Sequence, residues 1–379
     1  PSFIWQMAWC QTFCSKKPAI VDSCWLCAWV SNTSARHHSV VPLQRLLCSQ
    51  RPSDIVVERP RYQYPVAHKP RKSGVITERS GWNDIEGIHK MRVLITGARG
   101  QLGQSLRERA PEDWEVIFTD SKTLDITNST TVDAMIQGFQ PEIIVNTAAY
   151  TNVDQAEHEP QQAFAVNAHG VANLAQAAQK VGSRLIHIST DYVFSGNTDQ
   201  PYTYLDAPNP SNVYGKSKLA GELLALSLCD KTTIVRTSWV FSEHGRNFVP
   251  AVINKLLDNQ TVEIYENNIG TPTYAGALAD YIIELAEMQN PKKVVHYCSD
   301  VVLDRIKLAQ LIAEVVGQLT HQDLSLFITT RMTANSNQQT ARPNFSALST
   351  TLIQYNSDQS FEMLRQQIQS IVKILLATQ

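Results

Sequence analysis

An apolar run that ends in three spaced glycines constrains the fold of this chain most. Arg92 to Thr96 is predicted to be a buried parallel strand, and Gln101 to Arg109 the helix that follows it. Gly97 permits the tight turn, Gly100 lets backbone approach a diphosphate, and Gly103 lets the helix pack on the strand. A dinucleotide diphosphate is therefore expected at the helix N-terminus, the alternative being an ordinary strand-to-helix turn.

Composition indicates an ordinary globular protein. Apolar residues make up 43% and charged residues 18% of the 379 residues, and the formal net charge is −2. No basic tract is dense enough for a nucleic acid or an anionic membrane surface, so neither partner is expected. The sequence has no apolar run of membrane-spanning length and no secretory signal pattern, so the cytoplasm is the expected location.

Residues 1–90 differ in kind from the rest. They hold five of the seven cysteines and lack sustained helical or strand periodicity. Cys24 and Cys27 have the spacing of a zinc or redox pair, but no second pair or spaced histidines completes a zinc site. We expect Met91 to be the natural start, and the segment before it to be an over-extended reading frame, a fusion scar or a disordered tail.

Strands and helices alternate from Met91 onward, which is typical of an α/β fold. We predict a doubly wound Rossmann-type parallel sheet over residues 91–240. Residues 241–379 are predicted to form mainly a smaller substrate-binding lobe, with segments that return to the sheet. One long helix is expected from Gln161 to Val181, and a terminal helix from about Ser360 to Leu376.

A carboxylate ends the second predicted strand, Trp114 to Asp120. An acid at this position can hold the ribose hydroxyls of a dinucleotide, or it can be a simple strand-end Asp. Arg99 and Lys122 favour a 2′-phosphate instead, the group that separates NADP from NAD. The choice between the two cofactors stays open at this point.

Three hydroxyls and an amine follow, two of them at a strand end and two on a helix. Ser189 and Thr190 end the strand that begins at Arg184, and Tyr214 and Lys218 share one face of a later helix. A phenol with a pKa of about 10 is a poor acid at neutral pH, so the Lys218 ammonium and a nicotinamide charge are expected to lower the pKa of Tyr214. The alternative is a solvated helix face.

Two further residues are candidates for substrate contacts. Trp239, after the strand Thr232 to Thr237, either stacks on a substrate base or sugar or caps the core. Arg342 either binds a diphosphate bidentately or is a surface arginine with no partner.

Together these motifs resemble the dTDP-4-dehydrorhamnose reductase family, RmlD-like members of the extended short-chain dehydrogenase/reductases. The resemblance covers nearly all of the chain from Met91. Five stretches carry it: residues 147–154 (TAAYTNVD), 189–194 (STDYVF), 212–222 (NVYGKSKLAGE), 236–240 (RTSWV) and 270–273 (GTPT).

The resemblance implies roles for individual residues. Tyr214 would be the proton donor, Lys218 would position the ribose and lower the pKa of Tyr214, and Thr190 would share the hydrogen bond to the reacting oxygen. Asp191 and Trp239 would contact the nucleotide sugar. The positions at which the family holds NAD(P)H include Gly100, Gln101, Leu102, Asp120, Asp125, Ile126, Ala148, Ala149 and Tyr150.

The implied reaction is hydride transfer to C4 of a 4-keto-6-deoxy nucleotide sugar, giving dTDP-L-rhamnose, with NADPH favoured and NADH also used. Elimination is disfavoured because Tyr192 stands where related dehydratases carry Glu. A runner-up is a binding-only role, since the NADP-binding β subunit of methionine adenosyltransferase resembles the same family. Some members bridge subunits with Mg²⁺, but no motif carries those ligands over, so no metal residue is assigned. A monomer or homodimer is expected.

Overall fold

The computed structural model describes residues 90–264, 268–330, 340–350 and 357–378. The predictions for residues 1–89, including the Cys24 and Cys27 pair, lie outside this range. The strands are β1 Met91–Thr96, β2 Trp114–Thr119, β3 Ile143–Asn146, β4 Arg184–Thr190, β5 Thr232–Thr237, β6 Val240–Phe241, β7 Val262–Ile264, β8 Ile269–Gly270, β9 Thr273–Tyr274, β10 Val294–His296, β11 Leu303–Asp304 and β12 Ile328–Thr330. The α-helices are α3 Gln101–Arg109, α4 Ser129–Phe139, α5 Val153–His158, α6 Pro160–Phe164, α7 Val171–Val181, α8 Val213–Leu228, α9 Phe248–Leu257, α10 Ala275–Glu287, α11 Arg305–Thr320 and α12 Ser357–Ala377.

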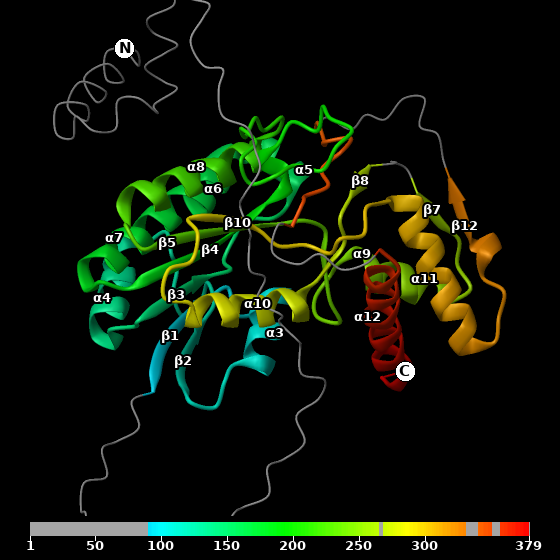
Figure 1. Cartoon of the computed structure of the whole chain (residues 1–379), viewed down its shortest axis with the longest axis horizontal. Coiled ribbons are helices and arrows are strands. Elements are labelled where there is room, and N and C mark those ends of the chain that lie inside the picture. Colours follow the sequence, from blue (N-terminus) through cyan, green and yellow to red (C-terminus); the bar gives the residue numbers. More distant parts are fainter. Residues whose placement is uncertain (1–89, 265–267, 331–339, 351–356, 379) are drawn as a thin grey trace, which may run out of the picture. The chain divides into compact units, whose positions relative to one another are not determined.

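Within the described residues, six parallel strands form the main sheet in the order β10-β5-β4-β3-β1-β2. Successive side chains of β1 point to opposite faces of the sheet, and both faces are buried. Val93 and Ile95 pack with α3 and α10 on one face, while Leu94 packs with α4, α7 and α8 on the other. Figure 1 shows these two helix layers on either side of the sheet. The predicted doubly wound parallel α/β fold is confirmed, and strand order reverses between β1 and β3, where such folds bind ligands.

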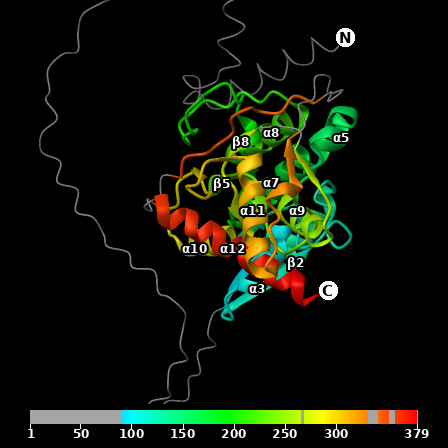
Figure 2. The ribbon, with the colours of Figure 1, turned by 90° about the vertical axis from the view of Figure 1, so that its right-hand side faces the viewer.

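A second core lies in the later part of the chain. Buried apolar residues of α9, α11 and α12 pack together with β7, and Figure 2 shows α11 and α12 side by side in front of α9. Between these elements, α10 and β10 return to the sheet, where α10 covers one face and β10 forms an edge. No helix in the described ranges combines the length and apolar character needed to cross a bilayer.

The long helix expected from Gln161 to Val181 is present, but it is not α-helical throughout. The segment divides into α6, a π-helical stretch Ala165–Gly170 and α7. Inside the π-helical stretch, the Asn167 side chain accepts from the Tyr150 backbone N–H at 2.8 Å and donates to its carbonyl at 2.9 Å. Because π-bulges re-aim helix residues at functional sites, this break serves to hold the loop after β3.

A chain that begins at Met91 is expected to fold and to be as stable as the full-length chain. The first strand starts at Met91, and its buried residues Val93 to Ile95 are already in the sheet core. The measurement is thermal unfolding of the shortened and full-length chains side by side. A loss of more than about 1 kcal/mol of unfolding free energy would contradict this expectation.

Candidate active site

A cavity of about 790 Å³ lies at the carboxyl ends of β1, β3 and β4, and it gathers most of the predicted site residues. Gly103 and Arg342 are the two that do not line it; Gly103 lies in the first turn of α3, against the glycine loop. The predicted residues that do line it are Gly97, Arg99, Gly100, Gln101, Leu102, Asp120, Asp125, Ile126, Ala148, Ala149, Tyr150, Thr190, Asp191, Tyr214, Lys218 and Trp239.

The glycine loop has the shape that a diphosphate requires. Gly97 has φ of +73°, and a Cβ there would lie 2.6 Å from the Ala148 backbone nitrogen. A Cβ on Gly103 would lie 2.5 Å from the Gly97 carbonyl, whereas one on Gly100 would meet only that carbonyl, at 3.3 Å. Because Gly100 precedes α3 without a side-chain cap, the N–H groups of the first turn are available to an anion, and the loop fits a dinucleotide.

Asp120 is held by its own turn and by Arg99. Its Oδ1 accepts the backbone N–H groups of Lys122 at 2.9 Å and Thr123 at 3.0 Å, and its Oδ2 pairs with Arg99 Nε. Burial raises the pKa of Asp120, but these hydrogen bonds and the Arg99 charge outweigh it and leave the pKa below its ordinary value. Lys122 therefore holds Asp120 through its backbone N–H group. The Arg99 side chain offsets the negative charge of Asp120, which would otherwise repel a 2′-phosphate.

The loop after β3 is held from two directions. Asn167 fixes both backbone polar groups of Tyr150, and the Tyr150 hydroxyl donates to Glu159 at 3.0 Å. The same π-helical stretch also packs on Ile126, a second predicted cofactor residue, because a Cβ on Gly170 would lie 2.7 Å from its side chain. The small residues Ala148 and Ala149 thus sit in a rigid wall of the cavity.

Thr190, Asp191 and Tyr214 form a buried hydroxyl–carboxylate group. The Thr190 hydroxyl donates to Asp191 Oδ1 at 3.0 Å and is hydrogen-bonded to the Tyr214 phenol. Asp191 Oδ2 accepts from Ser238 at 3.1 Å. Burial raises the pKa of Asp191, and hydrogen bonds from Ser346, Thr190 and Ser238 work against that rise. Asp191 therefore orients Thr190 from within the protein as well as lining the cavity.

The expected lowering of the Tyr214 pKa is wrong for the protein groups alone. Burial raises the pKa of Tyr214 above its ordinary value, the nearby Asp191 and Tyr192 raise it further, and the Thr190 hydrogen bond only partly opposes them. Burial also lowers the pKa of Lys218 to about 8, while its Nζ donates to the Ile188 carbonyl at 2.6 Å. A phenol that stays protonated is suited to donate a proton rather than to accept one.

Trp239 has both roles that the sequence left open. It has φ of +46°, a rare backbone conformation for a bulky residue, and its ring packs against the second core while lining the cavity. The Arg305 guanidinium lies 3.6 Å from the ring centroid, and a Cβ on Gly270 would meet the ring at 2.4 Å. Gly270 thus makes room for the indole, and Arg305 covers one of its faces.

Arg342 is not a surface arginine without a partner, so that alternative is wrong. Its Nη2 contacts both carboxylate oxygens of Asp154, at 2.8 and 2.7 Å. It lines a neighbouring hollow of about 330 Å³ together with Tyr192, Trp239 and Arg305. The bidentate contact of Arg342 with a diphosphate stays a prediction. To make it, the Arg342 guanidinium would have to release Asp154 or contact the diphosphate and Asp154 together.

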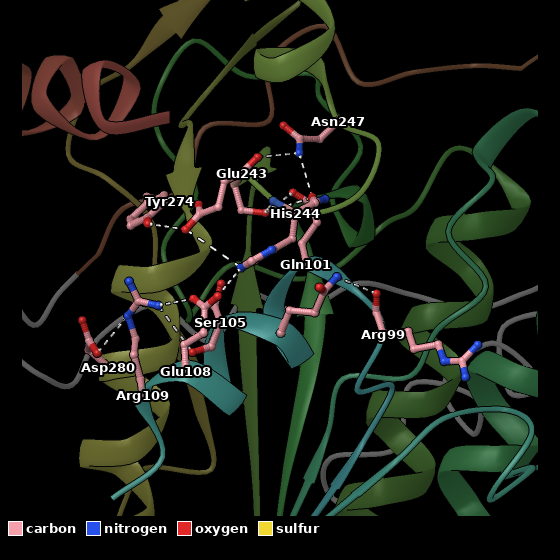
Figure 3. A network of polar contacts seen from close by, with 12 residues as sticks. Arg99, Gln101, Ser105, Glu108, Arg109, Glu243, His244, Asn247, Tyr274 and Asp280 are labelled. Atoms are coloured by element: carbon pink, nitrogen blue, oxygen red, sulfur yellow. Dashed lines mark hydrogen bonds and ion pairs between the residues drawn. The ribbon is translucent and has the colours of Figure 1, made fainter. Parts of the chain in front are cut away.

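A polar network joins α3 to the loop before α9 (Figure 3). Among the described residues, one His and Glu group has metal-ligand spacing: Glu108, Glu243 and His244. His244 Nε2 lies 2.9 Å from Glu108, Arg109 pairs with the other Glu108 oxygen at 3.3 Å, and Tyr274 donates to Glu243 at 3.1 Å. Protein groups already engage both carboxylates, so we assign no metal residue here.

Comparison with known proteins places this geometry in a family. Residues 91–377 match the family described as RmlD substrate binding domain. The chain belongs to this RmlD family. A dTDP-4-dehydrorhamnose reductase of Aggregatibacter actinomycetemcomitans is 46% identical over 52% of this chain and 67% of its own length. The spore coat polysaccharide biosynthesis protein SpsK of Bacillus subtilis is 37% identical over 68% and 89% of the two chains.

A solved RmlD-family structure agrees with the fold over its whole length. It is the dTDP-4-dehydrorhamnose reductase of Bacillus anthracis in complex with NADP, which is 32% identical. Its TM-score is 0.66, and the match covers 77% of this chain and 100% of that one. Together with the match of the family itself, this confirms the resemblance that the motifs indicated.

Several cavity residues of this RmlD-family chain were missed by sequence reasoning. Gly245 and Arg246 come from the loop after β6, and Arg305 begins α11. The only local signal for the first two is a glycine–arginine pair in a loop, which is common on protein surfaces. His187 behind Lys218 was also missed, because a histidine within an apolar strand is usually a core residue.

Proposed function

We propose that the protein is a dTDP-4-dehydrorhamnose reductase, which reduces the C4 keto group of dTDP-4-dehydro-L-rhamnose to give dTDP-L-rhamnose. The observation that carries this proposal is the single cavity in which the glycine loop, Thr190, Tyr214 and Lys218 meet. The binding-only alternative is not favoured, since a regulatory subunit has no need of a complete proton-donating group and the similar proteins are named as reductases.

The residues proposed to hold the dinucleotide come from three strand ends. The loop at Gly97 to Leu102 would take the diphosphate, Asp120 and Arg99 the adenosine ribose, and Ala148 to Tyr150 the middle of the molecule. Lys218 would hold the nicotinamide ribose. When bound, the reduced nicotinamide supplies the hydride.

Tyr214 is proposed to donate the proton that the new C4 oxygen requires. Its pKa lies above the ordinary value, so the phenol carries its proton at neutral pH. The Thr190 hydroxyl donates its one hydrogen to Asp191 in the structure, so it would have to turn that hydrogen from Asp191 to the same oxygen to share the hydrogen bond. An alkoxide is far more basic than a phenolate, so the transfer is downhill even with the raised pKa. Asp191, Trp239 and Arg342 would contact the nucleotide sugar.

A direct assay tests the proposed function. The full-length chain is mixed with NADPH and enzymatically prepared dTDP-4-dehydro-L-rhamnose, and loss of reduced-nicotinamide absorbance is followed. Oxidation of NADPH together with dTDP-L-rhamnose formation supports the proposal. The control is dTDP-glucose, which has no keto group and should give no signal. An inactive chain that alters the kinetics of an adenosyltransferase would favour the binding-only role instead.

We expect NADPH to be used more efficiently than NADH, with both accepted. Arg99 pairs with Asp120 and so offsets the negative charge that would repel a 2′-phosphate. The kcat/KM values for the two cofactors are compared in the natural chain and in Arg99→Gln, which should lose most of the preference. A preference for NADH of about a hundredfold, or about 2.7 kcal/mol, would contradict this expectation.

We also propose the cytoplasm as the location of the reaction, because both proposed reactants are multiply charged nucleotides that do not cross a bilayer unaided. The monomer or homodimer expected from the sequence stays a prediction.

A further inference from the structure

A fully buried histidine lies directly behind Lys218. His187 is in the middle of β4, and its Nε2 lies 3.4 Å from Lys218 Nζ. Its other ring nitrogen, Nδ1, lies 3.0 Å from the Asn146 side-chain nitrogen. Both contacts are closed to solvent, since His187 and Asn146 are 0% exposed and Lys218 is 2% exposed. Each polar atom must therefore find a matching partner inside the protein.

The direction of this hydrogen-bond chain is set by a backbone group. The Ala148 N–H donates to Asn146 Oδ1 at 3.1 Å, and a backbone N–H can only donate. The Thr96 hydroxyl also donates to Oδ1, at 2.7 Å. The amide oxygen of Asn146 therefore faces these two donors, and its NH₂ group faces His187 and donates to Nδ1.

This contact fixes the tautomer of His187. Because Nδ1 accepts a hydrogen bond, it carries no proton. Burial and the nearby Lys218 charge hold the pKa of His187 well below its ordinary value, so the ring is neutral. A neutral imidazole with a bare Nδ1 carries its one proton on Nε2. The Nε2–H group then points at Lys218 Nζ.

We infer that His187 is a positioning residue for Lys218: it donates its Nε2–H to the amine lone pair and so favours the uncharged form of Lys218 in the protein alone. An ammonium has three donors and no acceptor, so it would face the Nε2–H donor with no lone pair to offer. An amine satisfies both contacts, donating to the Ile188 carbonyl and accepting from His187. This inference deepens the proposed function, since it concerns the residue proposed to hold the nicotinamide ribose.

The other charged groups around Lys218 do not cancel this effect. Burial lowers the pKa of Lys218 to about 8, and Glu222, one turn along α8, acts in the opposite direction. Tyr214 and Asp191 line the same cavity, and Tyr214 stays protonated. With a pKa of about 8, Lys218 is present in both its charged and its uncharged form around that pH.

A pH dependence of dinucleotide binding follows. The ammonium form is the one expected to hold ribose oxygens, so affinity should be full below about pH 8 and should fall as pH rises through that value. Removing the His187 donor should let the ammonium persist to higher pH. The midpoint of the affinity loss should then rise by about one pH unit in His187→Phe.

The first test reads the tautomer directly in the full-length protein. Histidine labelled with ¹⁵N is observed by two-bond ¹⁵N–¹H correlation, and the His187 signals are assigned by their loss in His187→Gln. A protonated Nε2 and bare Nδ1 between about pH 6 and 9 are expected. A proton on Nδ1, or on both nitrogens, overturns the inference.

The second test measures NADPH affinity against pH by fluorescence for the natural chain, His187→Phe and His296→Phe. His296 is also a fully buried histidine, but its Nδ1 contacts the Tyr202 carbonyl instead of Lys218, so its variant should keep the natural midpoint. An unchanged midpoint in His187→Phe overturns the inference.

If that variant does not fold, Asn146→Asp serves instead. A carboxylate at position 146 must accept a hydrogen bond from Nδ1–H of His187, so this variant should reverse the tautomer and raise the midpoint of the affinity loss. If NADPH does not bind at all, the proposed function fails, while the tautomer still decides the inference.

Discussion

Replacing Tyr214 with Phe should lower kcat by about 10² to 10⁴, the usual contribution of a positioned general acid. The substitution removes the transferable proton but keeps the ring, which packs edge-on against Tyr192 with centroids 5.7 Å apart. The NADPH dissociation constant should change little, because no part of the ring is lost. The loss is therefore expected in kcat, as measured by the absorbance assay with the 4-keto nucleotide sugar.

Two variants from the same cavity serve as controls for this result. Tyr192→Phe also removes one phenol, but that hydroxyl is not bonded to Thr190, so kcat should fall less than about tenfold. Thr190→Val removes one hydrogen bond and should cost roughly 0.5 to 1.5 kcal/mol. If Tyr214→Phe lost no more turnover than Tyr192→Phe, Tyr214 would not be the proton donor.

The sheet and the glycine loop could be predicted because their signals are local. Val93, Leu94 and Ile95 are consecutive apolar residues, as expected for a strand that is buried on both faces, and the structure buries all three completely. Gly97, Gly100 and Gly103 all lie within the short loop from β1 to α3 and the first turn of α3. Their spacing therefore predicts the backbone shape of this loop without information from the rest of the chain. Tyr214 and Lys218 likewise belong to one helix, and their shared cavity followed from that spacing.

The polar contacts behind the site could not be predicted, because their partners are far apart in the sequence. Arg342 pairs with Asp154 across 188 positions, and His187 meets Asn146 across 41. The same reason explains why the π-helical stretch within the helix at residues 161–181 was not predicted. An Ala-rich pattern indicates helix, but the π-helical break depends on Asn167 reaching the Tyr150 loop, which periodicity does not encode.

The raised pKa of Tyr214 illustrates a related limit. Four-residue spacing places an ammonium and a phenol on one face, and the charge alone predicts a lowered pKa. The spacing does not reveal how deeply the phenol is buried, and burial is the larger influence in the folded protein. The prediction of a lowered pKa therefore failed because the spacing of Tyr214 and Lys218 carries no information on burial.

Replacing Gly100 with Ala should weaken NADPH binding by about 10- to 100-fold, or about 1.4 to 2.7 kcal/mol, while leaving the fold intact. The Gly100 backbone has φ of −72° and ψ of 167°, which any residue adopts, and the new Cβ would meet only the Gly97 carbonyl at 3.3 Å. The methyl group would instead occupy the space beside the first turn of α3, where the diphosphate must approach backbone. Binding is measured by NADPH fluorescence and stability by thermal unfolding.

Two other glycines separate this effect from a general intolerance of alanine. A Cβ on Gly138 in α4 would have nothing within 4 Å, so Gly138→Ala should keep the natural affinity and add roughly 0.5 to 1 kcal/mol of stability. In Gly103→Ala the Cβ would lie 2.5 Å from the Gly97 carbonyl, so both stability and affinity should fall. An affinity of Gly100→Ala equal to that of Gly138→Ala would place the diphosphate away from this loop. A Gly100→Ala protein that unfolds as readily as Gly103→Ala would instead assign Gly100 to packing.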